Sequence, residues 1–456
     1  MAESQASTDA LEASHITEKL VSFVARTHAA DLPPATLESG KVLILDTIGV
    51  ILAASKRPVG EIISRHVAAS AGAPATATVI GGKLKASPAM AALANGTMAN
   101  ALDYDGGGHS PTIIVPAALA VAEDRGLSGQ DVLTAFILAF EAIARLTNVI
   151  EAKRKSSGGG GPSPTRRGWW HVGLTGPIGA ALTASRLLGQ DMAHMATAVG
   201  IATCSSGGFR RNMGTMAKAL HSGNAARAGI DAALLAAQGF TADKEILEAP
   251  LGFIAAVAPA DERDVSALAR LASPYALEKS PGVKPYPSVT PSHALIDTVL
   301  AIRSREKFSL DDVQSIKTHF TPVSLFRSQA IDEESAGFCG PFLVALALVH
   351  GTVDLDHYSD AMLHDPQILA IMKKIEDLPL SELQGHKLIV RLRDGRELTA
   401  EAGRNRIVDL DTVLRKFDSC AVPAVGKSAA EAIKQQVLAL EQLPNIKTLM
   451  AACAGS

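Results

Sequence analysis

Two carboxylates and an imidazole lie close together in residues 95–119, NGTMANALDYDGGGHSPTIIVPAAL. Asp103 and Asp105 precede a run of three glycines, and His109 follows that run directly. Carboxylates and imidazoles can exchange protons with a substrate, and glycines, which have no Cβ, allow a ligand to approach the main chain closely. The same pattern is typical of a solvated loop between two helices, so spacing alone leaves both interpretations open.

A second group of polar residues lies in residues 204–240, CSSGGFRRNMGTMAKALHSGNAARAGIDAALLAAQGF. Lys218, His221 and Arg227 are predicted to lie on one helix, and Lys218 shares a face with His221 because the two are three residues apart. The surrounding sequence is too apolar for a solvated stripe, which favours an anion-binding pair.

Single histidines in apolar sequence are more often structural than catalytic when each is considered alone. If several polar groups converge on one cavity, cations would neutralise the carboxylates of a substrate while a base removes a proton beside one of them. The candidate set is Asp103, His109, His171, Lys218, His221 and His293.

The composition predicts that helices position these residues. Hydrophobic residues make up 47% of the 456 residues and aromatic residues only 4%, so Ala, Leu, Ile and Val must build the core, which favours closely packed helices. Residues 16–150 show mainly helical periodicity, and residues 131–150 are apolar on nearly every face, as a central helix requires. Residues 73–84 are compatible with a short hairpin.

A glycine-rich loop, SSGGGGPSP, spans residues 156–164 and comes shortly before Trp169, Trp170 and His171. Such a loop is either a gate over a site or an ordinary surface connection, and the sequence leaves both open.

The pattern changes after about residue 273. Residues 313–322 and 387–400 alternate as strands do, and Asp394-Gly395 predicts a type I′ hairpin turn in the second segment. Helices are expected from about residue 292 and at 341–350 and 365–375. The prediction is a mainly α fold, with a large all-helical domain from residues 1–272 and 403–456 and a smaller inserted α+β domain from residues 273–402.

Charge and cysteine spacing exclude several classes of function. Lys and Arg number 43 against 46 Asp and Glu, with no long block of one sign, so a nucleic-acid partner is not expected. The four cysteines are far apart without a CxxC pair, which fits a reducing compartment and argues against structural zinc. The N-terminus lacks an apolar signal segment, and Glu141 and Arg145 interrupt the longest apolar run, so we expect a cytoplasmic protein without a membrane span.

Several catalytic motifs are missing from the sequence. It contains no GxxxxGK[ST] loop, no strand-borne GxGxxG, no HExxH, no EF-hand loop and no GxSxG elbow. Nucleotide binding therefore has no support, and hydrolase and metalloprotease functions are disfavoured.

Four segments, in this order and spacing, resemble the MmgE/PrpD family: NGTMANALDYDGGGHSPTIIVPAALA, RGWWHVGLTGPIGAALTASRLLG, GTMAKALHSGNAARAG and KPYPSVTPSHALID. The family includes 2-methylcitrate dehydratase, cis-aconitate decarboxylase and iminodisuccinate epimerase. The resemblance covers nearly the whole chain. It implies a helical domain built from both chain ends, an inserted α+β lid domain, a site in the cleft between them that uses neither metal nor cofactor, and a homodimer.

The first two segments carry family positions as follows. Asp103 matches the first acid of the family's D-[FY]-D-D segment, and His109 matches the histidine seven residues before a proline, here Pro116. His171 matches the histidine of R-G-[FW]-H, with one additional tryptophan in this chain.

The other two segments add further positions. Lys218 and His221 match the lysine and histidine of K-P-L-H, and His293 matches the histidine that closes the K-x-[YF]-P segment. The resemblance implies acid/base roles for one or two histidines and carboxylate binding by Lys218 and its neighbours. The expected catalytic residues are Asp103, His109, His171, Lys218 and His293. The expected substrate-binding residues are Gly107, Lys218, His221, Lys284 and Tyr286.

This chain departs from the family pattern at several polar positions. A family histidine, an acid, a threonine, a cysteine and a tyrosine are replaced here by Asn100, Gly106, Gly107, Ser288 and Phe342 respectively. Phe342 cannot donate a proton, so the usual substrates 2-methylcitrate and cis-aconitate are disfavoured, or the chemistry is altered.

These observations favour a cofactor-independent lyase, of the dehydratase or decarboxylase type, that removes a proton next to a carboxylate of a small di- or tricarboxylic acid. An isomerase or epimerase that uses the same site and a non-catalytic carboxylate-binding protein are alternatives. Metal-dependent hydrolysis by Asp103, His109 and His171 is disfavoured because these residues lack a recognised ligand spacing.

Overall fold

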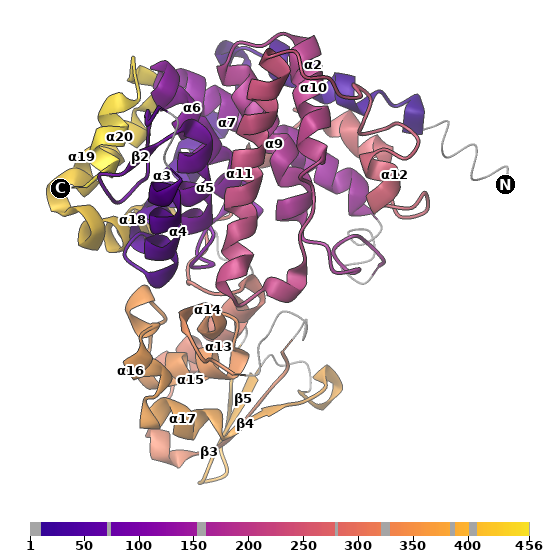
Figure 1. Ribbon diagram of the computed structural model, residues 1–456. Coiled ribbons are helices and arrows are strands. Elements are labelled where there is room, and N and C mark those ends of the chain that lie inside the picture. The colour runs from indigo at the N-terminus through magenta and orange to yellow at the C-terminus, as the bar shows by residue number, and fades with distance from the viewer. Residues whose placement is uncertain are drawn as a thin grey trace.

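The computed structural model describes residues 11–70, 74–152, 161–278, 281–320, 329–383, 388–400 and 408–455. It has two domains, a large helical one and a smaller one with a mixed sheet (Figure 1). The predicted mainly helical fold with a smaller α+β part is confirmed.

Helices from both ends of the chain build the large domain. The C-terminal helices, yellow in Figure 1, lie beside the early helices, and α18 packs against α3. The helices are α2 (Ile16–Arg26), α3 (Pro34–Ala54), α4 (Pro58–Ala69), α5 (Pro88–Ala99), α6 (Pro111–Arg125), α7 (Gly129–Ile150), α9 (His171–Leu187), α10 (Met192–Thr203), α11 (Met216–Ala237), α12 (Phe253–Val257), α18 (Leu410–Val425), α19 (Lys427–Leu438) and α20 (Lys447–Cys453).

Glycines allow two of these helices to approach each other closely. A Cβ on Gly96 of α5 would lie 2.9 Å from the Cα of Gly223 in α11, so neither position has room for a larger residue. The crossing brings the C-terminal end of α5 beside the first turns of α11. The two polar segments recognised in the sequence therefore lie next to each other.

The central helix predicted at residues 131–150 is α7. Its length and apolar character would suffice to cross a membrane, but 78% of its most apolar window is buried inside the protein. The two charged residues in its middle are paired inside the protein, because Arg145 pairs with Glu141 at 2.6 Å and Glu141 accepts the amide N–H of Ala276 at 2.7 Å. The neighbouring parts of the large domain thus cover its apolar faces.

The expected short hairpin is present, although it ends later than predicted. β1 (Ala77–Thr78) pairs antiparallel with β2 (Lys85–Ala86). Elsewhere in the described part of the large domain, Trp169 and Phe209 form an isolated antiparallel bridge.

The small domain packs helices against a four-stranded sheet of order β4-β3-β5-β6. β3 pairs parallel with β4 and antiparallel with β5. The strands are β3 (Val313–Thr318), β4 (Ile375–Asp377), β5 (Leu388–Leu392) and β6 (Glu397–Thr399), and the helices are α13 (His293–Arg305), α14 (Glu333–Ala336), α15 (Gly340–His350), α16 (Asp360–Leu363) and α17 (Pro366–Met372).

Two local predictions for this domain need correction. The β5–β6 hairpin exists, but its turn is not type I′, which needs positive φ at two central residues. Gly395 alone has a positive φ, of 91°, and the Leu392 N–H bonds to the Arg396 carbonyl at 2.9 Å. The helix expected at 365–375 ends at Met372, and Ile375 begins a strand.

Four predicted segments lie partly outside the described residues. The structure does not describe residue 73 of the expected short hairpin, residues 156–160 of the glycine-rich loop, residues 321–322 of the first expected strand or residue 387 of the second strand segment.

Each domain has its own hydrophobic core. The larger core draws on residues from Leu11 to Val283 and from Val413 to Cys453, and the smaller core on residues from Tyr286 to Ala400. The chain thus passes from one core to the other between Val283 and Tyr286. Lys284, an expected substrate-binding residue, lies on this crossing.

Candidate active site

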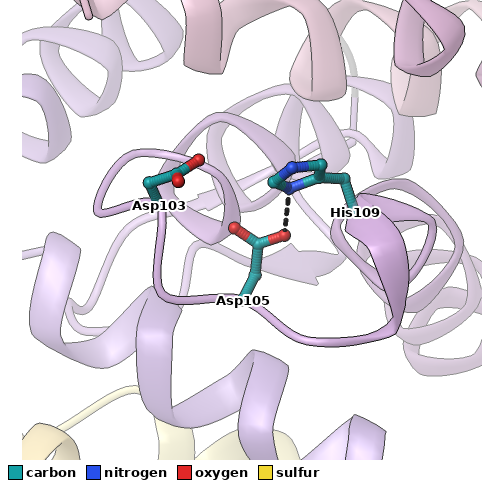
Figure 2. Close-up of side chains that lie close together, drawn as sticks. All are labelled: Asp103, Asp105 and His109. Atoms are coloured by element: carbon teal, nitrogen blue, oxygen red, sulfur yellow. Dashed lines mark hydrogen bonds and ion pairs between the residues drawn. The ribbon is translucent and has the colours of Figure 1, made fainter. Parts of the chain in front are cut away.

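Asp103 lies at the centre of the predicted site, just after α5 (Figure 2). Its Oδ1 lies 2.5 Å from the Lys218 Nζ and its Oδ2 lies 2.8 Å from the Lys284 Nζ. All three side chains are buried, and Asp103 has a φ of 48°, which is unusual for a residue with a side chain. Lys218 also donates to the Asn100 carbonyl at 2.9 Å, so α11, the end of α5 and the crossing between the domains meet at one carboxylate.

The two lysines decide the charge of Asp103. Burial opposes ionisation, but Lys218 and Lys284 outweigh it and hold the pKa of the Asp103 carboxyl well below its usual range. The same lysines also lower the pKa of Asp105, whose carboxylate lies within 4.8 Å of Asp103, so two ammonium groups stand against two carboxylates at this point. Lys218 donates two of its three N–H groups to described residues, and the third can donate to an oxygen of an anionic ligand.

Asp105 and His109 form a hydrogen-bonded pair beside Asp103. The His109 Nδ1 lies 2.6 Å from the Asp105 Oδ2 (Figure 2). When Nδ1–H donates to the carboxylate, Nε2 is left as the proton acceptor, and Asp105 stabilises the imidazolium that forms. Burial opposes the charge on Asp105, but His109 outweighs it and lowers the pKa of the Asp105 carboxyl.

Aromatic rings surround His109. The His109 ring centroid lies 5.8 Å from that of Trp170 and 6.1 Å from that of His171, and the His171 Nε2 bonds to the Gly108 carbonyl at 3.1 Å. The His221 ring lies 5.3 Å from that of Trp170, while its Nδ1 bonds to the Ala217 carbonyl within α11. The predicted histidines of the large domain are thus close together around Trp170.

The small domain contributes His293 and Tyr286. The His293 Nε2 donates to the Ser288 carbonyl at 3.1 Å, and burial together with the charge of Lys284 lowers the pKa of His293 to about 4. His293 is therefore a neutral imidazole at physiological pH. The Tyr286 hydroxyl donates to Asp297 at 2.7 Å, and its ring lies 5.6 Å from that of His293.

The glycine loop is held by the rest of the chain. Gly107 has a φ of 60°, and its N–H bonds to the carbonyls of Pro281 and Gly282 at 3.1 and 3.3 Å. A Cβ on Gly107 would lie 2.6 Å from the Cγ of Pro111. The positive φ and the close contact with Pro111 thus require a glycine at position 107. Its N–H holds the segment that leads to Lys284.

A small cavity opens beside Asp103 between the two domains. Arg57, Leu102 and Asp103 line it from the large domain, and Glu333, Phe338 and Tyr358 line it from the small domain. The Arg57 Nη1 lies 2.9 Å from the Glu333 Oε1, so an ion pair joins the domains at the wall of the cavity. A ligand in this cavity would contact both domains.

The donor set also bears on a metal. One ligand atom each from Asp103, Asp105 and His109 lies within 4.8 Å of the others, a cluster that could hold an ion. Both oxygens of Asp103 are already paired with ammonium groups, however. A divalent cation would compete with two lysines for this carboxylate, so the pairing of Asp103 disfavours a metal at this cluster.

Comparison with known proteins agrees with this arrangement of two domains around one site. Residues 18–266 match the MmgE/PrpD N-terminal domain, and residues 286–442 match the MmgE/PrpD C-terminal domain. The chain belongs to the MmgE/PrpD family. The boundary between the two matches falls where the chain crosses from one hydrophobic core to the other.

Curated relatives in this family include cis-aconitate decarboxylases. The human cis-aconitate decarboxylase is 24% identical, with 96% of this chain and 95% of the human chain aligned. The cis-aconitate decarboxylase of Aspergillus terreus is 25% identical over 97% of both chains, and the cis-aconitate decarboxylase-like protein oryM of Aspergillus oryzae is 25% identical over 98% of this chain and 99% of its own. The resemblance recognised from motifs is therefore confirmed.

Several site residues had no signal in the sequence. Arg57, Glu333 and Tyr358 stand in no motif, and only the folding of the small domain onto the large one brings them to Asp103. Asp105 was recognised as one of a carboxylate pair, but its bond to His109 was not predicted. Phe342 is fully buried, and its ring lies 6.4 Å from that of Tyr358.

Proposed function

We propose that this MmgE/PrpD protein is a cofactor-independent lyase, of the dehydratase or decarboxylase type, that acts on a small di- or tricarboxylic acid. One observation carries the proposal: a buried carboxylate held by two lysines lies beside an Asp105–His109 pair at a cavity between two domains. The names of the relatives, cis-aconitate decarboxylases, support a tricarboxylate as the first substrate to test.

The lysines supply the binding charge. Lys218 and Lys284 hold the Asp103 carboxylate between them, and Lys218 keeps a third N–H that can donate to a substrate carboxylate. Because the ammonium groups are buried, their attraction for a carboxylate is stronger than it would be in water. This binding fixes the carbon next to the carboxylate relative to His109.

The Asp105–His109 pair supplies the proton transfer. In a dehydration, the C–H proton beside the carboxylate moves to the His109 Nε2, and the electron pair left on carbon expels hydroxide, which leaves as water after protonation. In a decarboxylation, the C–C bond to a carboxylate breaks and CO₂ leaves. The carbon that receives the electron pair takes a proton from the His109 imidazolium, which regains its proton from water. Asp105 stabilises the imidazolium in both cases.

Epimerisation is the second candidate, and the position of His293 favours it. His109 belongs to the large domain and His293 to the small domain, and both interact electrostatically with Asp103. An epimerase needs two proton-exchanging groups on opposite faces of one carbon, and we propose that the imidazoles of the two domains fill these two roles. The absence of a hydroxyl at Phe342 is compatible with this reaction, which requires no leaving group.

Proton NMR in D₂O tests the proposal directly. The EDTA-treated protein is incubated with cis-aconitate, citrate, 2-methylcitrate and aminodicarboxylates. Loss of water, or loss of CO₂ with deuterium incorporated at the carbon that takes up a proton, supports the lyase, and deuterium incorporation with inversion alone would replace it with the epimerase. Binding measured by calorimetry without any exchange would overturn both in favour of a carboxylate-binding protein.

The Lys218→Ala variant gives the matching test of the site. Removing one ammonium group should abolish both exchange and binding if the lysines hold the substrate. The matched control is Lys244→Ala, which removes a lysine of the loop after α11 that lies outside this site. Retention of turnover in Lys218→Ala would overturn the proposed role of the buried lysines.

A further inference from the structure

Tyr358 is a buried side chain whose hydroxyl has no hydrogen-bond partner among the described residues. The residue is 5% exposed, and it lines the cavity between the domains together with Asp103. Buried hydroxyls are nearly always paired, because an unpaired one is destabilising. An unpaired phenol on the wall of a cavity is typical of a group whose partner is a ligand.

The position of Tyr358 is fixed from the large domain. The Arg57 Nη2 donates to the Leu355 carbonyl at 3.1 Å, and the Leu355 carbonyl also accepts the N–H of Tyr358 at 3.2 Å. The ion pair between Arg57 and Glu333 holds the same guanidinium. Contact between the domains therefore helps to fix the position of Tyr358 in the wall of the cavity that Asp103 also lines.

Tyr358 lies next to the residue at which this chain lacks an expected hydroxyl. The rings of Phe342 and Tyr358 are 6.4 Å apart and inclined at 57°. Phe342 is fully buried and can contribute only apolar contact. In this part of the small domain the phenol therefore belongs to Tyr358 and not to residue 342.

We propose that the Tyr358 hydroxyl donates a hydrogen bond to an oxygen of the bound carboxylic acid, and that it supplies the phenol that Phe342 lacks. This inference rests on the proposed function, because it places the substrate in the cavity beside Asp103. The bond stabilises the negative charge that grows on the substrate oxygen when the neighbouring C–H or C–C bond breaks. No proton is transferred to or from Tyr358.

The electrostatic surroundings suit a donor. Burial and the negative charges of Asp103 and Asp354 raise the pKa of the Tyr358 hydroxyl well above its usual range. The phenol therefore keeps its proton at physiological pH. It can donate to an anionic oxygen but does not act as a base.

Replacing Tyr358 with Phe tests the proposal. The variant removes one oxygen, and kcat/KM should fall about 100-fold, as for the loss of one donor to a developing charge. The melting temperature should stay equal or rise, because the removed hydroxyl had no partner to lose. The matched control is Tyr275→Phe, which removes the hydroxyl of a buried tyrosine in the core of the large domain. Unchanged kcat/KM, or a loss of activity that follows a lower melting temperature, would overturn the inference.

Calorimetry with cis-aconitate and citrate separates this inference from the proposed function. If the wild type and Tyr358→Phe convert an acid equally fast, the proposed lyase activity is supported and the proposed role of Tyr358 is overturned. If the wild type binds an acid without turnover, the lyase falls, and at least 10-fold weaker binding by Tyr358→Phe supports the hydrogen bond while equal binding overturns it. If the wild type binds neither acid, the inference is overturned together with its substrate class.

Discussion

The Lys416 Nζ and the Asp46 Oδ1 lie 2.6 Å apart and join α18 to α3, next to the loop that carries Asp103 and Asp105. Lys416 also donates to the Tyr104 carbonyl at 2.6 Å, and Asp46 accepts the N–H of Gly106 at 2.9 Å. The buried pair therefore holds the backbone on both sides of Asp105. The loop that carries the candidate acids is positioned by α3 and α18, which are more than 350 residues apart in sequence.

The Lys416→Met variant should be strongly destabilised. It leaves the Asp46 carboxylate buried without its cation, and breaking a buried pair in this way typically costs about 3–5 kcal/mol. Urea unfolding followed by circular dichroism measures the change. The matched control is Lys434→Met, which removes a more exposed pair with Asp418 and should cost much less. Equal losses of unfolding free energy in the two variants would contradict the proposal that the Lys416–Asp46 pair holds the loop.

The Asp105→Asn variant should slow proton transfer while leaving the fold intact. An amide at position 105 no longer stabilises a His109 imidazolium, and loss of a positioned acid/base group costs about 10²–10⁴-fold in rate. Deuterium exchange of the substrate identified by NMR gives the rate. His194→Gln is the control, because His194 forms a similar pair with Asp191 on the surface, at 2.7 Å. An exchange rate in Asp105→Asn equal to that of the wild type would remove His109 from the mechanism.

The four motifs predicted the family, and composition with helical periodicity predicted the mainly helical fold. Asp103 and His109 lie in one short segment, so their closeness follows from the sequence, whereas Lys218 is 115 residues from Asp103 and reaches it only through the packing of α11 against α5. The sequence also predicted the small α+β part, because the strands alternate and the hairpin carries Asp394-Gly395. It missed the turn type, since Gly395 alone determines the backbone there and Asp394 keeps a negative φ.

Contacts between distant segments could not be predicted in the same way. Tyr358 lies in an ordinary polar stretch, DLDHYSD, and nothing in that pattern marks a side chain that lines a cavity. Its role depends on Arg57, some 300 residues earlier, which bonds to the turn before it. The same holds for Lys416, whose helix shows only an amphipathic pattern. Tertiary packing and not local pattern makes these residues part of the site.

Stability in acid should depend on Asp103. Its folded pKa lies below the ordinary value of about 3.9 because of the two lysines. Below about pH 4 the unfolded chain binds a proton here before the folded protein does, so the stabilising contribution is present above that pH and is lost as the pH falls through the folded pKa. Between pH 6 and pH 3, the free energy of unfolding in urea should fall less in Asp103→Asn than in the wild type. Equal decreases in the two proteins would contradict the assigned charge of Asp103.

Gly107 and Gly108 should respond differently to alanine. Both have φ near 60°, a conformation that costs a residue with a side chain about 1–2 kcal/mol. A Cβ at Gly107 also meets Pro111, whereas one at Gly108 has open space. Gly107→Ala should therefore lose more stability and raise KM, because it displaces residues 281–282 and with them Lys284. Urea unfolding and steady-state kinetics of both variants test this, and equal behaviour would exclude the Pro111 contact as the cause.

Arg57 should act through Tyr358. Arg57→Ala removes both the bond to the Leu355 carbonyl and the ion pair with Glu333, whereas Glu333→Gln removes only the partly exposed ion pair. Arg57→Ala should therefore raise KM at least about 10-fold, as the loss of one bond worth about 1.4 kcal/mol would do, and Glu333→Gln should change it little.

A double-mutant cycle distinguishes whether Arg57 positions the Tyr358 phenol or only holds the two domains together. If Arg57 positions the phenol, adding Arg57→Ala to Tyr358→Phe should cost much less than Arg57→Ala costs alone, because the group it positions is already gone. Arg303→Ala is the control, since Arg303 bonds to the Val349 carbonyl within the small domain and should be additive with Tyr358→Phe. If the effects of Arg57→Ala and Tyr358→Phe were also additive, Arg57 would hold the two domains together without positioning Tyr358.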